Sequence, residues 1–286
     1  MFGECHAHIF MNGYDYNKAV REQRNGPVDS LIREHFEAYR KAGITYVRDG
    51  GDPYGVSKRA MELAPEYGIT YRTPVFALHK EGHYGGIVGR SFSDLAGFRS
   101  RLRELKNEGG QFVKLMTTGI LDFDRNGEVT GEKLSGSEVR ALVETAHEMG
   151  FSVMTHTNGS QAVIEAAEAG ADSIEHGNFQ DEESLSCLKE KNAVWVPTLV
   201  TVRNLIGDGR FPDDSLQAIW KIQKKTLRMG FEKGVCLALG SDAGAYRVLH
   251  GQGLLDEYRA FCDVLGESEV LREKLKWGEK VIREKF

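Results

Sequence analysis

Six side chains that are able to bind metal ions stand at separated points of the chain: His6, His8, Lys114, His156, His176 and Asp242. Imidazole suits Zn²⁺ and similar divalent ions, and carboxylates complete such sites. His6 and His8 are two positions apart, and side chains at i and i+2 of a β-strand point to the same side, so both can hold one ion. A single histidine is more often a hydrogen-bonded core residue. The six together predict a divalent metal centre.

Lys114 is the unusual member of this set. A lysine that points into a protein interior loses solvation, which lowers its pKa and favours the neutral amine. A neutral amine can add CO₂ to form a carbamate, an anion with two oxygens that is able to bridge two metal ions. The alternative is that Lys114 forms an ion pair with a nearby carboxylate such as Asp49 or Glu175.

The elements that must position these residues follow a repeated pattern. A helical stretch ends in Gly or Asn, as a left-handed residue after a helix requires, and an apolar run follows at once. With an opening strand near 2–8, these runs predict strands at 44–50, 69–78, 111–119, 151–159, 171–177, 193–200 and 235–244. Helix starts are marked by a capping box at Ser135 and Glu138 and by Asp94, Asp181 and Asp213.

Eight strands that alternate with helices predict an α/β protein, a (β/α)8 TIM barrel formed by one domain over residues 1–286. A doubly wound open sheet is the alternative, but the turn after its first strand usually carries G-x-G-x-x-G, and His6-Ala7-His8 stands there instead. The segments 10–28, 117–134 and 200–213 are long, whereas the opposite joins are short. All six candidate ligands fall at or near the carboxyl ends of predicted strands, the catalytic face of barrel enzymes.

Composition limits the other classes. The chain has 286 residues, of which 41% are hydrophobic and 28% charged, which is typical of a globular domain. The net charge of −5 argues against nucleic-acid and polybasic membrane partners, so we expect a small-molecule substrate. No apolar run approaches the roughly 20 residues that span a bilayer. Four separated cysteines and no export signal predict a cytoplasmic protein. The oligomeric state, a homo-oligomer included, is left open.

Several stretches resemble the amidohydrolase superfamily, in particular its imidazolonepropionase-like and prolidase-like members. They are HAH at 6–8, HYGG at 83–86, FVKLMTTG at 112–119, the segment 138–159, AGADSIEHG at 169–177, LALGSDAG at 237–244 and HG at 250–251. Together they extend over nearly the whole chain.

The resemblance implies a hydrolase with two divalent metal ions. His6, His8 and Asp242 would hold the buried ion and His156 and His176 the exposed one, with carboxylated Lys114 and a hydroxide as bridges. Asp242 would act as general base and then as general acid. Zn²⁺ is the favoured ion, with Mn²⁺ and Fe²⁺ as alternatives. The expected reaction cleaves the amide (C–N) bond of a small molecule such as an N-acyl amino acid, a dipeptide or a cyclic amide.

The sequence departs from the family in two respects. Relatives carry a β-sandwich built from segments before and after the barrel, and here we expect most of it to be absent, which leaves a nearly bare barrel. Relatives that cleave amino-acid amides often place an aromatic or imidazole group where this chain has Asn158. We expect His83, Tyr84, Asn158 and Arg247 to contact substrate, since they follow predicted strands.

Two enzymatic alternatives stay open on the same scaffold. A lactone or ester hydrolase would use the same groups to attack an ester carbonyl. A one-metal deaminase would normally carry a Glu shortly after His156 or His176, and neither histidine is followed by one. A non-catalytic barrel is a third reading, which the complete ligand set argues against. The loops that set substrate choice have no readable code.

Overall fold

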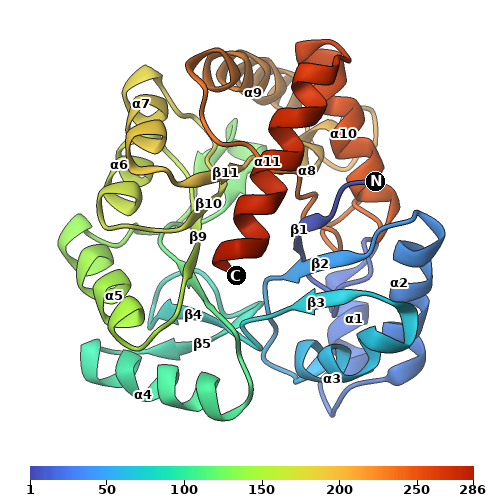
Figure 1. The fold of residues 1–286 in the computed structure, drawn as a ribbon, viewed down its shortest axis with the longest axis vertical. Helices are drawn as coiled ribbons and strands as arrows, with labels where there is room; N and C mark the ends of the chain where they lie inside the picture. The colour runs from blue at the N-terminus through green and yellow to red at the C-terminus, as the bar shows by residue number, and fades with distance from the viewer.

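The computed structural model describes residues 1–286, and its helices surround a central group of strands (Figure 1). The strands are β1 (Glu4–Ala7), β2 (Tyr46–Asp49), β3 (Thr70–Arg72), β4 (Ala77–Lys80), β5 (Gly89–Phe92), β6 (Val113–Met116), β7 (Leu121–Asp122), β8 (Glu128–Val129), β9 (Val153–Thr157), β10 (Ser173–His176) and β11 (Val194–Val196). The helices are α1 (Tyr16–Gln23), α2 (Asp29–Lys41), α3 (Val56–Leu63), α4 (Leu95–Asn107), α5 (Gly136–Glu148), α6 (Ser160–Glu168), α7 (Glu182–Lys191), α8 (Val200–Arg203), α9 (Asp213–Lys233), α10 (Gln252–Leu265) and α11 (Glu269–Lys285).

The fold is α/β with parallel sheets. One sheet has the order β1-β2-β3 and the other β11-β10-β9-β6-β4-β5, while β7 and β8 form a small antiparallel hairpin. Parallel strands joined by helices place their carboxyl ends at the same edge, which is where the predicted ligands lie.

The structure corrects the prediction of an eighth strand at 235–244. This segment forms isolated parallel bridges, of Leu237 with Trp195 and of Ala243 with Ala7, rather than a continuous strand. Asp242 has a φ of 63°, in the left-handed region, which interrupts the extended backbone. The segment nevertheless lies between β11 and β1, because the Cys5 amide donates to the Leu239 carbonyl at 3.0 Å.

The expected third strand at 69–78 is divided into β3 and β4. Pro74 lacks an amide proton and Val75 has a φ of 65°, so the backbone cannot continue a regular ladder between them. β3 pairs with β2 and β4 pairs with β6, so the two halves of this segment belong to different sheets. The prediction also missed β5, and it missed the β7–β8 hairpin and the short helices α1 and α8, which lie within the long loops.

The predicted helix starts are confirmed. Ser135 and Glu138 form a capping box at α5, and the side chains of Asp94 and Asp181 cap α4 and α7. α9 begins at Asp213. These caps satisfy amide groups that a helix leaves without internal partners, and so they fix where each helix meets its strand.

α11 packs across the amino ends of the strands, and the carboxyl terminus lies near their centre in Figure 1. Phe286 joins a buried cluster with Phe112, and the two rings are 5.1 Å apart. At Gly278 a Cβ would lie 1.8 Å from the Leu237 carbonyl oxygen, so only glycine permits this close approach. The apolar cluster closes the end of the sheets opposite to the candidate ligands.

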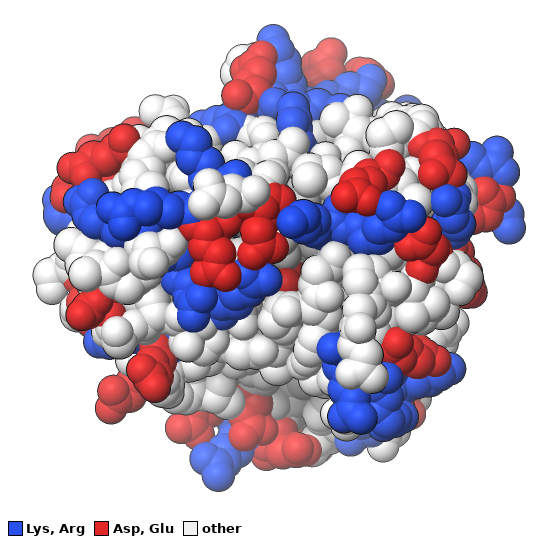
Figure 2. Space-filling view, turned by 90° about the horizontal axis from the view of Figure 1, so that it is seen from below, with Lys and Arg blue, Asp and Glu red and all other residues white.

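No helix combines the length and the hydropathy that crossing a membrane would require. On the face shown in Figure 2, basic and acidic side chains are interspersed rather than gathered by sign. Surface ion pairs occur throughout the molecule, for example between Arg59 and Asp29 and between Arg99 and Glu148.

Candidate metal centre

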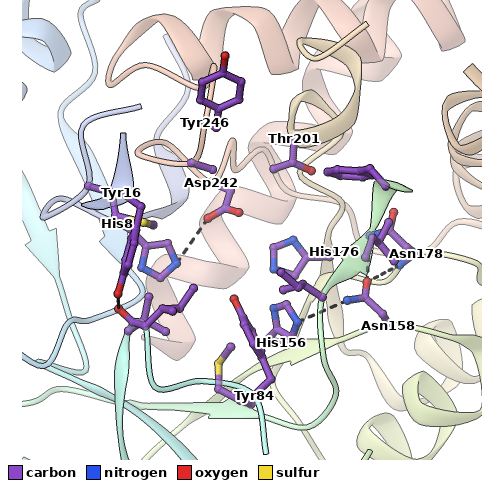
Figure 3. Close-up of a pocket in the computed structure, with 18 of the residues that line it drawn as sticks. His8, Tyr16, Tyr84, His156, Asn158, His176, Asn178, Thr201, Asp242 and Tyr246 are labelled. Carbon is purple, nitrogen blue, oxygen red and sulfur yellow. Dashed lines mark hydrogen bonds and ion pairs between the residues drawn. The ribbon is translucent and has the colours of Figure 1, made fainter. Parts of the chain in front are cut away.

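The candidate ligands converge on one cavity of about 340 Å³ at the carboxyl ends of the strands. Its lining includes Lys114. It also includes His8, His156, His176 and Asp242, which Figure 3 labels. The fully buried His6 lies next to this lining, with its Nε2 3.5 Å from Asp242 Oδ1. The structure therefore brings together all six residues predicted as metal ligands.

His6, His8 and Asp242 form a group of three metal-ligand type. The ligand atoms of the three side chains all lie within 4.8 Å of one another. Nε2 of His6 and Nε2 of His8 are each 3.5 Å from Asp242 Oδ1. Two imidazoles and a carboxylate around one point are a donor set suited to a divalent ion.

The other two histidines lie together in the same cavity. The rings of His156 and His176 have centroids 4.6 Å apart, and the ring of His176 is 5.1 Å from that of His6. His176 has a φ of 67°, so the last residue of β10 leaves the sheet in the left-handed conformation. This backbone turn, together with the register of β10 against β9, brings the two rings side by side.

In each of the four histidines, one ring nitrogen forms a hydrogen bond with the protein and the other ring nitrogen does not. The bonded pairs are His6 Nδ1 with Glu175 Oε2 at 2.8 Å, His8 Nδ1 with the Gly51 carbonyl at 3.4 Å, His156 Nε2 with the Gly119 carbonyl at 3.0 Å, and His176 Nδ1 with Thr198 Oγ1 at 2.7 Å. Carbonyl and carboxylate oxygens only accept, so the bonded nitrogens of His6, His8 and His156 carry the proton and their opposite nitrogens keep the lone pair. The partner of His176 is the Thr198 hydroxyl, which is able to accept in the same way. This is the arrangement that orients histidines for a metal ion.

The histidines are also held in the neutral form that a metal requires. Burial lowers the pKa of His8 and the pKa of His156 to about 3. Burial likewise places the pKa of His6 and of His176 well below the ordinary value. Imidazoles with such low pKa values do not compete for protons at neutral pH.

Lys114 has no ion-pair or hydrogen-bond partner for its Nζ, although the side chain is only 1% exposed. Both carboxylates considered as partners are engaged elsewhere. Glu175 accepts from Arg48 and His6, and Asp49 accepts from the Ile9 and Gly51 amides. The alternative of an ion pair with either acid is therefore wrong. Burial lowers the pKa of the Lys114 amine, which favours its neutral form.

Asp242 belongs to the segment 235–244, which lies between β11 and β1. Its amide donates to the His6 carbonyl at 2.8 Å, and the adjacent Ser241 donates to the buried Glu4 carboxylate through both its amide and its hydroxyl. Burial raises the pKa of Asp242 above the ordinary value for an aspartate. A carboxylate that is held in place and has a raised pKa is suited to accept a proton and then donate it.

Two orphaned buried atoms indicate what the site is built to hold. His6 Nε2 and Lys114 Nζ are both buried without a hydrogen-bond partner, which is costly unless something else binds there. A divalent ion would satisfy the His6 lone pair, and a carbamate would turn the lysine into a ligand. The residues present thus fit a metal centre.

Of the four predicted substrate contacts, the structure places two in the cavity. Tyr84 lies with its ring 5.2 Å from that of His156, and Asn158 donates to the Gly119 carbonyl at 3.1 Å. His83 and Arg247 do not line this cavity.

Both residues have other partners in the structure. The imidazole of His83 donates to the Glu132 carbonyl at 2.9 Å, across to the β8–α5 loop. Arg247 is turned outward to form an ion pair with Asp208, and its side chain is 48% exposed. Loop contacts of this kind cannot be read from position after a strand.

The wall of the cavity contains residues that the sequence reasoning missed. Thirteen of the 22 lining residues are hydrophobic, and many come from the long loops. The missed residues that shape the mouth and wall include Tyr16, Ile120, Leu121, Phe123, Thr201, Arg210, Phe211 and Tyr246. Apart from Tyr246, these residues lie in the loops 10–28, 117–134 and 200–213, whose length indicated that they take part in the site but identified no individual side chain.

Comparison with known proteins agrees with this geometry. The chain is 28% identical over 207 residues to an ochratoxinase from Aspergillus niger, which covers 70% of this chain and 41% of that protein. It is 25% identical over 242 residues to the uncharacterized protein Rv2915c from Mycobacterium tuberculosis, which covers 82% of this chain and 63% of the relative. The chain therefore spans about two fifths of the ochratoxinase and three fifths of Rv2915c.

Solved structures show the same fold. A Xaa-Pro dipeptidase with methionine in its active site aligns over 99% of this chain and 75% of its own, with a TM-score of 0.78 and 21% identity. The A. niger ochratoxinase aligns over 95% of this chain and 68% of its own, with a TM-score of 0.75 and 20% identity. The profile of the Amidohydrolase family matches residues 4–273, which is nearly the whole chain. The chain belongs to the amidohydrolase family.

Proposed function

We propose that this chain is a hydrolase that cleaves the amide (C–N) bond of a small molecule and depends on two divalent metal ions. One observation carries the proposal. Four buried, neutral histidines each have one ring nitrogen engaged, and they share a cavity with Asp242 and an unpaired lysine. Family membership supports amide hydrolysis in general.

The donor groups divide between two ions. His6, His8 and Asp242 would hold one, and His156 with His176 the other, while Lys114, as a carbamate, would be a further ligand. When bound, two divalent ions polarise a carbonyl group and lower the pKa of water enough to make it nucleophilic near neutral pH. Zn²⁺ is our proposed ion, with Mn²⁺ or Fe²⁺ as alternatives.

Asp242 is the proposed proton carrier. Its carboxylate lines the cavity and lies beside His6 and His8, so the attacking water would come within its reach. The carboxylate would accept a proton from that water and donate it to the leaving nitrogen. The hydrogen bonds of Ser241 to Glu4 and of the Asp242 amide to His6 hold the carboxylate in place for this transfer.

The cavity indicates a small substrate with apolar groups. A volume of about 340 Å³ and a mainly hydrophobic wall suit a compact molecule such as an N-acyl amino acid, a dipeptide or a cyclic amide. One similar structure is named a Xaa-Pro dipeptidase, which supports a dipeptide-sized substrate.

We further propose that the strands close into a (β/α)8 barrel of a single domain over residues 1–286. The segment around 237–243 bonds to β11 on one side and to β1 on the other. The divided third strand bonds to β2 through β3 and to β6 through β4. Both contacts support continuous pairing around the ring.

A hydrolysis panel tests the proposed function. Protein prepared with Zn²⁺ or Mn²⁺ is assayed on N-acyl amino acids, dipeptides, cyclic amides and lactones, before and after chelation and after metal is returned. We expect turnover of at least one amide class, its loss on chelation and its recovery with metal. Turnover confined to lactones or esters would contradict amide hydrolysis, and activity that survives complete metal removal would contradict the metal centre.

A further inference from the structure

A second cavity of about 370 Å³ adjoins the candidate active site and shares five lining residues with it. The shared residues are Met11, Tyr16, Arg210, Ala245 and Tyr246. They form the boundary between an inner chamber, which contains the metal ligands, and an outer chamber toward the α1 end of the first long loop.

Arg210 is the only arginine that lines either chamber. It stands in the loop between α8 and α9 and forms no ion pair or side-chain hydrogen bond with the protein. Its guanidinium lies over the ring of Tyr246, 4.2 Å from the centroid, and 5.3 Å from that of Phe211. Aromatic contacts orient a guanidinium while they leave its N–H groups available.

The neighbouring acid does not neutralise Arg210. Asp208 gives one carboxylate oxygen to Arg247 and the other to the Tyr246 hydroxyl, at 2.8 Å. Arg247 above all, and Arg210 more weakly, hold the pKa of Asp208 below its usual range. Asp15 also lines the outer chamber, but it caps α1 through the Lys18 amide and lies 3.8 Å from Arg21. Arg247 is thus paired and lies outside the chambers, whereas Arg210 is unpaired and lies between them.

We propose that Arg210 is a specificity residue that binds a free carboxylate of the substrate at the boundary of the two chambers. The inference rests on the proposed amide hydrolysis and names its substrate class: amides with an apolar group and a free carboxylate. The apolar group packs against the hydrophobic wall of the inner chamber. The carboxylate extends to Tyr246, which Figure 3 shows beyond Asp242, on the side away from Tyr84 and His156. A planar guanidinium matches a carboxylate with two parallel hydrogen bonds.

The kinetic test compares N-benzoylphenylalanine with N-benzoylphenethylamine, which has the same amide bond and ring but no carboxylate. We expect the wild-type kcat/KM to favour the acid by at least about tenfold, as a charge-assisted hydrogen bond supplies. Arg210→Gln should remove this preference, mainly by raising the KM for the acid. Arg203→Gln is the control and should keep the preference, because Arg203 pairs with Asp263 and lies outside both chambers.

A binding measurement separates this inference from the proposed reaction. Calorimetric titration of both compounds into Asp242→Asn, with and without Arg210→Gln, reports recognition without turnover. Tighter binding of the acid that disappears with Arg210→Gln supports the carboxylate site, even if wild-type protein hydrolyses neither compound and the amide proposal fails. Equal binding of the two compounds to Asp242→Asn, or a preference for the acid that survives Arg210→Gln, would overturn it.

Discussion

The metal-ligand end of the strands and the rim of the cavity are built differently, although they lie side by side. At the strand ends, each histidine is fixed by a neighbour that the fold itself supplies, such as the Gly119 carbonyl or the Glu175 carboxylate. At the rim, side chains come from loops and contact residues of other loops, as the pairing of Arg247 with Asp208 shows.

The difference teaches which function each region can serve. Side chains on strand ends have their direction set by the two-residue alternation of the strand and their positions by its register, so a reaction centre there is precise. Loop residues can be exchanged without disturbing the core, so they are suited to the choice of substrate. The following changes ought to separate the two regions, with large effects at the strand ends and small ones at the rim.

Asp242→Asn should produce the largest loss. The amide cannot take up a proton as the carboxylate does, and it is a weaker metal ligand, so kcat/KM should fall by at least about a thousandfold. Circular dichroism should remain that of wild type. Asp208→Asn, which alters an acid outside the chambers, is the control and should retain most activity. Asp242→Asn activity within tenfold of wild type would mean that another group carries the proton.

Lys114→Ala should lose metal and activity together while the fold persists. The reason is that the Lys114 amine is buried without a partner, and in our proposal it contributes to the site as a carbamate ligand. Acetate or propionate at tens of millimolar should restore part of both metal content and activity by occupying the vacated space. Elemental analysis and kinetics measure this, with the exposed Lys133→Ala as control. Full metal content in Lys114→Ala would remove the bridging role.

Thr198→Val should have an intermediate effect. It removes the partner of His176 Nδ1, at 2.7 Å, while it preserves side-chain shape. Loss of such a supporting hydrogen bond typically lowers metal affinity or activity about 10–100-fold. Competition with a fluorescent chelator measures the affinity, and Thr226→Val on α9 is the control. Unchanged metal affinity in Thr198→Val would show that this hydrogen bond does not orient the ring for metal.

His83→Gln should have the smallest effect. The side chain bonds to the Glu132 carbonyl and does not line the cavity, so kcat/KM should stay within about threefold of wild type. Steady-state kinetics on the best amide substrate measures it, with Tyr84→Phe, a residue of the cavity lining, assayed beside it. A loss above tenfold in His83→Gln would mean that this rim residue takes part in the reaction, which would contradict the distinction between the two regions.

The sequence predicted the part of the molecule in which local rules decide the outcome. Alternating helices and strands, the capping box at Ser135, and histidines at strand ends all depend on short-range geometry, and the structure contains them. It failed where distant contacts decide. Pro74 alone indicated the division of the third strand next to Val75. The sequence around Asp242 did not predict its left-handed backbone.

The rim shows the same limit more strongly. Arg210 and Arg247 are alike in type and both lie in loops that follow strands or short helices, yet one lines the chambers and the other faces outward. The partner that separates them, Asp208, is 39 positions from Arg247 in the chain. No periodicity or motif carries such information, so individual loop contacts could not be predicted.

The most direct test of the central claim is a crystal structure of zinc- or manganese-loaded, active protein with anomalous diffraction data. The account predicts two anomalous peaks in the inner chamber, about 3.5–4 Å apart. One should lie at His6, His8 and Asp242 and the other at His156 and His176, with branched density on Lys114 between them. A single peak, or an unmodified Lys114 amine beside a fully loaded site, would contradict it.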